Sequence, residues 1–143
     1  MGDLEKLVTI AKAVRTGFDK YVEKNGGYGS DLTGFCHDAS VVIFKLAKKY
    51  GIDKVQMGEG VGHWFVMLDG MIIDVTSTQF SQPDKVAVLP MERAEKIGAW
   101  WELQEKLDAP KNHIEYDNMR FAIEVAEEIL IGEMPQLTEN KES

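Results

Sequence analysis

Residues 63–76 read HWFVMLDGMIIDVT, two runs rich in aromatic and β-branched residues with Asp69-Gly70 between them. Such runs are typical of β-strands, and an Asp-Gly pair between two strands favours a tight hairpin turn. The pattern therefore predicts an antiparallel β-hairpin in which Leu68 pairs with Met71 and Phe65 pairs with Asp74.

This pairing places a histidine and a carboxylate on the same face of the hairpin. Side chains alternate between the two faces of a strand, so His63 and Asp74 share a face, and Trp64 and Ile73 lie on the other. His63 and Asp74 are then diagonal neighbours, with backbones about 7–8 Å apart and side chains able to meet. A carboxylate in this position fixes the tautomer of an imidazole, stabilises its charged form and leaves the second ring nitrogen free.

Cys36 is the only cysteine, so the chain cannot form an internal disulfide. Helical spacing predicts a helix over residues 36–50, ended by Gly51, with the thiol in its first turn. The N-terminus of a helix stabilises a thiolate, which is the nucleophilic form of cysteine. Cys36, His63 and Asp74 are therefore candidates for nucleophile, base and orienting acid. The alternatives are that Cys36 is a small hydrophobic residue of the core, that His63 is a core or edge-strand histidine with no catalytic role, and that Asp74 is a strand residue that happens to be acidic.

The stretch of residues 34–40, GFCHDAS, followed by a helix, then His63-Trp64 and residues 73–76, resembles the core of the transglutaminase-like branch of the papain-like cysteine enzymes. The resemblance covers residues 34–80, about a third of the chain. It implies a nucleophile helix packed on an antiparallel sheet, with Cys36 as nucleophile, His63 as base and Asp74 as orienter. A papain-type protease would have a glutamine six residues before the nucleophile, where this chain has Ser30. The backbone N–H of Cys36 is thus the only oxyanion donor that we expect.

The remaining segments predict further helices and strands around this core. Apolar spacing predicts helices over residues 3–24, 91–108 and 111–131, and short strands over 54–57 and 85–89. The glycines of residues 58–62 predict a flexible hinge loop before His63. We expect one α+β domain over residues 1–143, a papain-like or transglutaminase-like core flanked by further helices, with a frayed tail over 133–143.

Composition excludes several kinds of partner. The chain has 143 residues, 44% of them hydrophobic and 28% charged, and a net charge of −8. That size allows one core, and the negative charge argues against nucleic acid or an anionic membrane surface as a partner. No apolar run is long enough for a membrane span, and the N-terminus lacks a signal-peptide core, so we expect a cytoplasmic protein.

Cofactor and metal sites are weakly supported by the sequence. Cys36, His37, His63, Asp74 and His113 are all residue types that bind zinc, but adjacent residues of a helix point about 100° apart, which separates Cys36 from His37. The glycines at 58, 60 and 62 lead into a strand, whereas a dinucleotide phosphate needs a helix N-terminus. We therefore expect neither a metal nor a cofactor.

Together these features predict a cysteine acyl-transfer enzyme that acts on an amide of a protein or peptide through a thioester. A peptidase, a glutamine deamidase and a transglutaminase all use this chemistry, and the residues do not choose among them. The alternative is a non-catalytic binding module of the same fold. Trp100 and Trp101 are expected either to cover the core or to form a partner surface. Gln79-Phe80 are expected either to line the cleft or to anchor a turn.

Overall fold

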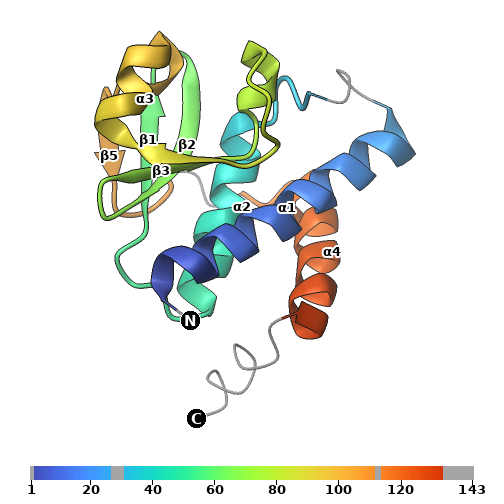
Figure 1. The fold of residues 1–143 in the computed structure, drawn as a ribbon. Coiled ribbons are helices and arrows are strands. Elements are labelled where there is room, and N and C mark those ends of the chain that lie inside the picture. Colours follow the sequence, from blue (N-terminus) through green and yellow to red (C-terminus); the bar gives the residue numbers. More distant parts are fainter. Residues whose placement is uncertain (1, 27–30, 112–113, 134–143) are drawn as a thin grey trace.

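The structure is a computed structural model that describes residues 2–26, 31–111 and 114–133. The fold is α+β, as the sequence predicts, with four α-helices and one five-stranded antiparallel sheet in the described residues (Figure 1). The α-helices are α1 (Asp3–Asn25), α2 (Cys36–Lys49), α3 (Met91–Ile97) and α4 (Asp117–Glu133). The strands are β1 (Gln56–Gly60), β2 (His63–Leu68), β3 (Met71–Asp74), β4 (Ala87–Pro90) and β5 (Glu105–Leu107). Two short 3-10 helices are η1 (Ser77–Phe80) and η2 (Ala99–Trp101).

The predicted hairpin forms the centre of the sheet, whose strand order is β4-β3-β2-β1-β5. Leu68 pairs with Met71 as expected. Asp69 and Gly70 both have positive φ, 50° and 78°, the backbone conformation that a two-residue hairpin turn requires. The predicted register is confirmed for the three pairs from Leu68–Met71 to Val66–Ile73, and the predicted Phe65–Asp74 pair is not among them.

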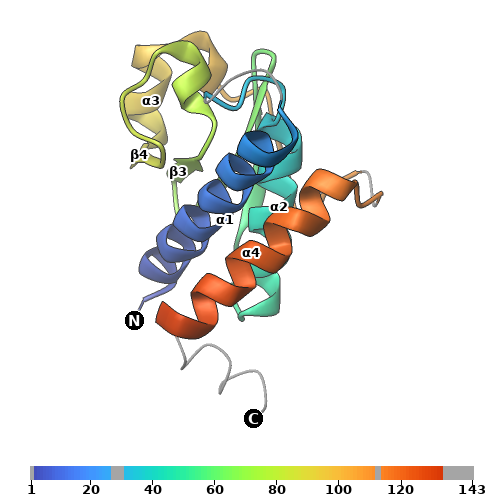
Figure 2. The same cartoon turned by 90° about the vertical axis from the view of Figure 1, so that its right-hand side faces the viewer.

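The two faces of the sheet contribute to two separate hydrophobic cores. Val66 and Ile73 belong to the larger core, which the sheet shares with α1, α2 and α4. Phe65 and Ile72 belong to a smaller core with Ala94 of α3 and Trp101 of η2. Figures 1 and 2 show α1, α2 and α4 gathered on one side of the sheet and α3 on the other. This is the alternation of faces that the hairpin register predicts.

The prediction of a flexible hinge loop over residues 58–62 is wrong. Strand β1 extends to Gly60, and only Val61 and Gly62 separate it from β2. The two glycines in the strand allow close packing. A Cβ on Gly58 would lie 2.5 Å from the ring of Phe65, and a Cβ on Gly60 would lie 1.9 Å from the carbonyl oxygen of Trp100. Glycine in a strand here marks the approach of another group, as it often does.

The expected single helix over residues 91–108 is also wrong. Helix α3 ends at Ile97, Gly98 is extended, and the chain continues through η2 into β5, which pairs with β1 at the edge of the sheet. Pairing with the open edge of β1 thus overrides the helical spacing of the apolar residues.

The other predicted elements are present with shifted ends. The helices expected over 3–24 and 36–50 match α1 and α2, and the last helix begins at Asp117 instead of near residue 111. The strands expected over 54–57 and 85–89 are observed as β1 and β4. Glu133 ends α4, and the rest of the tail that was expected to fray, residues 134–143, lies outside the described residues.

Candidate functional site

Cys36 is the first residue of α2 and is partly exposed. The residue before it, Phe35, packs against Phe18 and Tyr21 of α1, with ring centroids 5.7 and 6.3 Å apart. The carbonyl of Phe35 accepts the N–H of Ala39 at 2.8 Å, which begins the helix. The sulfur is thus fixed at the positive end of a helix of 14 residues, where backbone N–H groups favour an anion.

His63 and Asp74 meet as the hairpin register predicts. Nε2 of His63 lies 2.6 Å from Oδ2 of Asp74, and both residues are 1% exposed. A short contact of this kind, shielded from water, holds the imidazole ring in one orientation. It also leaves Nδ1 as the ring nitrogen that is free to exchange a proton with another group.

The carboxylate of Asp74 has partners for both of its oxygens. Oδ2 accepts the indole N–H of Trp101 at 2.7 Å in addition to its contact with His63. Oδ1 accepts the backbone N–H and the hydroxyl of Thr76 at 2.8 and 3.2 Å. A buried carboxylate requires such hydrogen-bond partners, and these donors satisfy both oxygens of Asp74.

The ionisation of His63 reflects this environment. Burial by itself lowers the pKa of His63, but the hydrogen bond and the charge of Asp74, together with the neighbouring Cys36, raise that pKa to about 9. Cys36 thus acts in the same direction as Asp74 on the pKa of His63. Nδ1 of His63 is nevertheless buried and has no hydrogen-bond partner among the described residues, so the thiol is not hydrogen-bonded to the ring in this structure.

Aromatic side chains surround the imidazole. The rings of Phe80 and His63 pack nearly perpendicular to each other with centroids 4.9 Å apart, and Trp100 stacks on Phe80 with centroids 4.6 Å apart. The side chain of Gln79 donates to the carbonyl of Thr76 at 3.0 Å. Of the two roles considered for Gln79-Phe80, the glutamine anchors the turn and the phenylalanine packs against the histidine.

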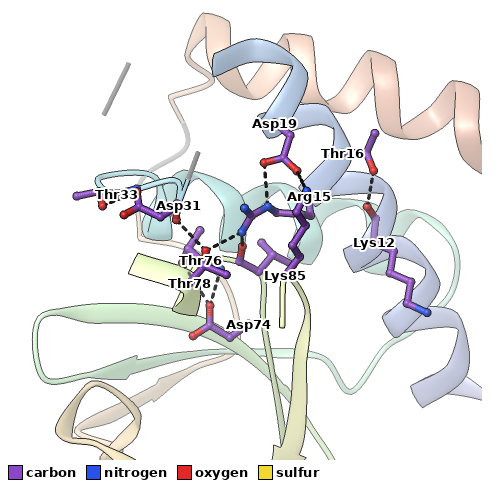
Figure 3. A network of polar contacts seen from close by, with 11 residues as sticks. Lys12, Arg15, Thr16, Asp19, Asp31, Thr33, Asp74, Thr76, Thr78 and Lys85 are labelled. Atoms are coloured by element: carbon purple, nitrogen blue, oxygen red, sulfur yellow. Dashed lines mark hydrogen bonds and ion pairs between the residues drawn. The ribbon is translucent and has the colours of Figure 1, made fainter. Parts of the chain in front are cut away.

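A buried arginine joins the segments on either side of the site. Arg15 of α1 donates to the carbonyl of Val75 at 2.7 Å and to the hydroxyl of Thr78 at 2.9 Å, and the hydroxyl of Thr78 donates to the carbonyl of Asp31 at 2.9 Å. Figure 3 shows Arg15 reaching from α1 toward the segment that follows Asp74. Arg15 therefore binds the end of β3 directly and is linked through Thr78 to the loop before Cys36.

The residues next to Cys36 have structural contacts. His37 is 36% exposed and lies against Trp64, with ring centroids 5.2 Å apart. Asp38 accepts a hydrogen bond from Asn118 at 2.8 Å, which ties α2 to α4. Neither residue contacts the His63–Asp74 pair through a described hydrogen bond.

A zinc site finds no support in the described residues, which contain no group of three or more His, Cys, Asp or Glu side chains arranged to hold a metal ion. His113, which the zinc hypothesis included, lies outside the described residues, as does Ser30 at the position of the expected oxyanion glutamine.

Sequence reasoning did not identify Trp101 as part of the site. The pair of tryptophans indicated only that one of them faces inward, and Trp101 is the buried one, 1% exposed. Its role as a donor to Asp74 has no local signal, because 27 positions separate the two residues.

Comparisons of the chain with protein-family models, curated proteins and solved structures found no match. Among the helices of the described residues, none combines the length and the apolar character that crossing a membrane requires.

Proposed function

We propose that this protein is a cysteine-dependent acyl-transfer enzyme with Cys36 as nucleophile, His63 as general base and acid, and Asp74 as the group that orients His63. The observation that carries the proposal is the buried 2.6 Å contact between His63 and Asp74, beside a thiol at a helix N-terminus. The resemblance of residues 34–80 to the transglutaminase-like core supports the same assignment and the corresponding papain-like fold.

In the first half-reaction, His63 takes the thiol proton at Nδ1 and the Cys36 sulfur attacks the carbonyl carbon of an amide. The C–N bond breaks as the imidazolium returns the proton to the leaving nitrogen, which departs as an amine or ammonia. The product on the enzyme is a thioester. Asp74 remains an anion and stabilises the imidazolium throughout.

In the second half-reaction, a water molecule or a second amine attacks the thioester, and His63 accepts its proton. The C–S bond then breaks and the thiol of Cys36 is restored. Water acting on a peptide-derived thioester gives proteolysis, water acting on a glutamine-derived thioester gives deamidation, and an amine gives transamidation. We expect the substrate to be a protein or peptide, because all three outcomes start from an amide of that kind.

Mass spectrometry of a protein lysate treated with the purified protein tests the proposal. The wild type is expected to produce new peptide termini, a one-dalton gain on glutamine, or cross-links to an added primary amine, and each product identifies one reaction. Cys36→Ala serves as the control and is expected to produce none of them. The proposal is overturned if the wild type and Cys36→Ala give the same products while the folded wild type is unreactive toward a thiol-alkylating reagent. The alternative of a binding module would then stand.

A further inference from the structure

Two consecutive tryptophans differ in the partners of their indole N–H groups. The N–H of Trp101 donates to Oδ2 of Asp74 at 2.7 Å, whereas the N–H of Trp100 is buried and has no hydrogen-bond partner in the part of the chain that the structure describes. Oδ2 is also the oxygen that contacts His63. One carboxylate oxygen is thus shared between an indole and an imidazole.

We infer that Trp101 is a positioning residue that acts on His63 through Asp74, because its indole N–H takes up part of the negative charge of the carboxylate oxygen that it shares with the imidazole. The inference rests on the proposed function and deepens it, because it identifies a residue that adjusts the pKa of His63, the proposed general base. Its physical content is the ionisation of His63, which can be measured without a substrate.

The fold places Trp101 with little freedom. Its side chain is 1% exposed and packs in the smaller core with Phe65 and Ile72. The segment that carries it crosses β1 so closely that only glycine fits at position 60. Backbone hydrogen bonds fix both sides of this crossing, from Val61 N–H to the carbonyl of Ala99 at 3.2 Å and from Gln104 N–H to the carbonyl of Glu59 at 2.7 Å. The indole therefore meets Asp74 in a preformed arrangement.

The hydrogen bond from Trp101 to the shared oxygen is expected to disfavour the protonated form of His63. The indole N–H of Trp101 compensates part of the negative charge on Oδ2 of Asp74, so less of that charge stabilises the His63 imidazolium. This effect is strong because the site is buried. If the indole N–H is removed and the carboxylate stays in place, the full charge acts on His63 and favours its protonated form. The carboxylate is expected to stay in place, because Thr76 still holds Oδ1 with two hydrogen bonds.

Titration of the His63 ring by NMR tests this in Trp101→Phe, with Trp100→Phe as the matched control. Trp101→Phe is expected to raise the pH midpoint of His63 by roughly 0.5 to 1 unit relative to the wild type. Trp100→Phe removes an N–H that has no partner and is expected to leave the midpoint within about 0.2 units of the wild type. Equal midpoints in the two variants, or a lower midpoint in Trp101→Phe, would overturn the inference.

A second measurement needs no substitution and applies if Trp101→Phe does not fold. As the pH rises and His63 loses its charge, the shared oxygen becomes a better acceptor for Trp101, and its indole proton resonance is expected to move downfield with the midpoint of His63. The Trp100 resonance is expected to stay flat. A Trp101 resonance that does not follow His63 contradicts the inference. Neither readout depends on turnover, so a failed acyl-transfer assay leaves the result interpretable.

Discussion

At the scale of single residues, the site is built from a histidine and a carboxylate that are both 1% exposed. Each group contributes a polar partner to the other, which lowers the cost of burying both. The contact could be predicted from the sequence because a short turn fixes the register of His63 against Asp74. The donor Trp101 could not, because no local pattern relates it to Asp74 across 27 positions.

The His63–Asp74 pair is expected to make stability depend on pH. The pKa of His63 rises from an ordinary 6.5 to about 9 in the folded protein. The stabilisation is therefore fully present below pH 6.5 and is lost as the pH rises through about 9. Its upper limit is on the order of 3 kcal/mol.

Urea unfolding between pH 6 and pH 10 measures this dependence, with Asp74→Asn as the comparison. The free energy of unfolding of the wild type is expected to fall more steeply over this range than that of Asp74→Asn, in which the neutral amide does not stabilise an imidazolium. If the free energies of unfolding of the two proteins changed with pH in parallel, the stabilising interaction between protonated His63 and Asp74 would be contradicted, whatever the absolute stabilities.

At the scale of elements, glycines at contact points allow the strands and helices to pack closely on one another. The absence of a side chain at Gly58 and Gly60 lets Phe65 and the backbone of Trp100 pack closely on β1. Likewise, Gly17 lets α4 pack closely on α1. The sequence shows these glycines but not their neighbours, which explains why residues 58–62 indicated a loop. In the same way, apolar spacing over residues 91–108 could not reveal that Gly98 ends the helix and that residues 105–107 pair with β1.

Substitution of Gly17 tests the packing of α1 on α4. A Cβ at this position would lie 2.8 Å from the backbone of Ala122, so the two helices must separate to admit it. Gly17→Ala is expected to destabilise the fold by about 1–3 kcal/mol, despite the better helix propensity of alanine. Gly132→Ala in α4 is the control, since a Cβ at that position would meet none of the described residues within 4 Å beyond its own stretch of helix. Chemical denaturation measures both, and equal stabilities of the two variants would contradict the close packing.

At the scale of the whole molecule, Arg15 connects the helical layer with the segments that flank the site. It is 3% exposed and binds the carbonyl of Val75, the hydroxyl of Thr78 and the carboxylate of Asp19. The α+β class and the hairpin followed from sequence patterns, but this connection did not, because Arg15 lies on a helical face that otherwise resembles ordinary core packing.

Replacement of Arg15 tests its part in joining these layers. Arg15→Met keeps much of the side-chain volume but leaves the carbonyl of Val75 without its donor, and it is expected to cost about 2–3 kcal/mol of stability. Lys85→Met is the matched control, because Lys85 also binds Asp19, at 3.3 Å, but is 69% exposed. Its loss is expected to cost less than about 0.5 kcal/mol. Thermal and urea unfolding compare the two, and a cost for Arg15→Met as small as that of the control would contradict the role of Arg15.

The central claim is that Cys36 and His63 act as a nucleophile and its base, and the rate of Cys36 alkylation at near-neutral pH tests it most directly. The chain supplies its own control, because His37 is adjacent to the cysteine in sequence but lies against Trp64. The wild type and His37→Gln are expected to react at similar rates, both at least about tenfold faster than His63→Gln. A folded wild type that reacts no faster than His63→Gln would contradict the account.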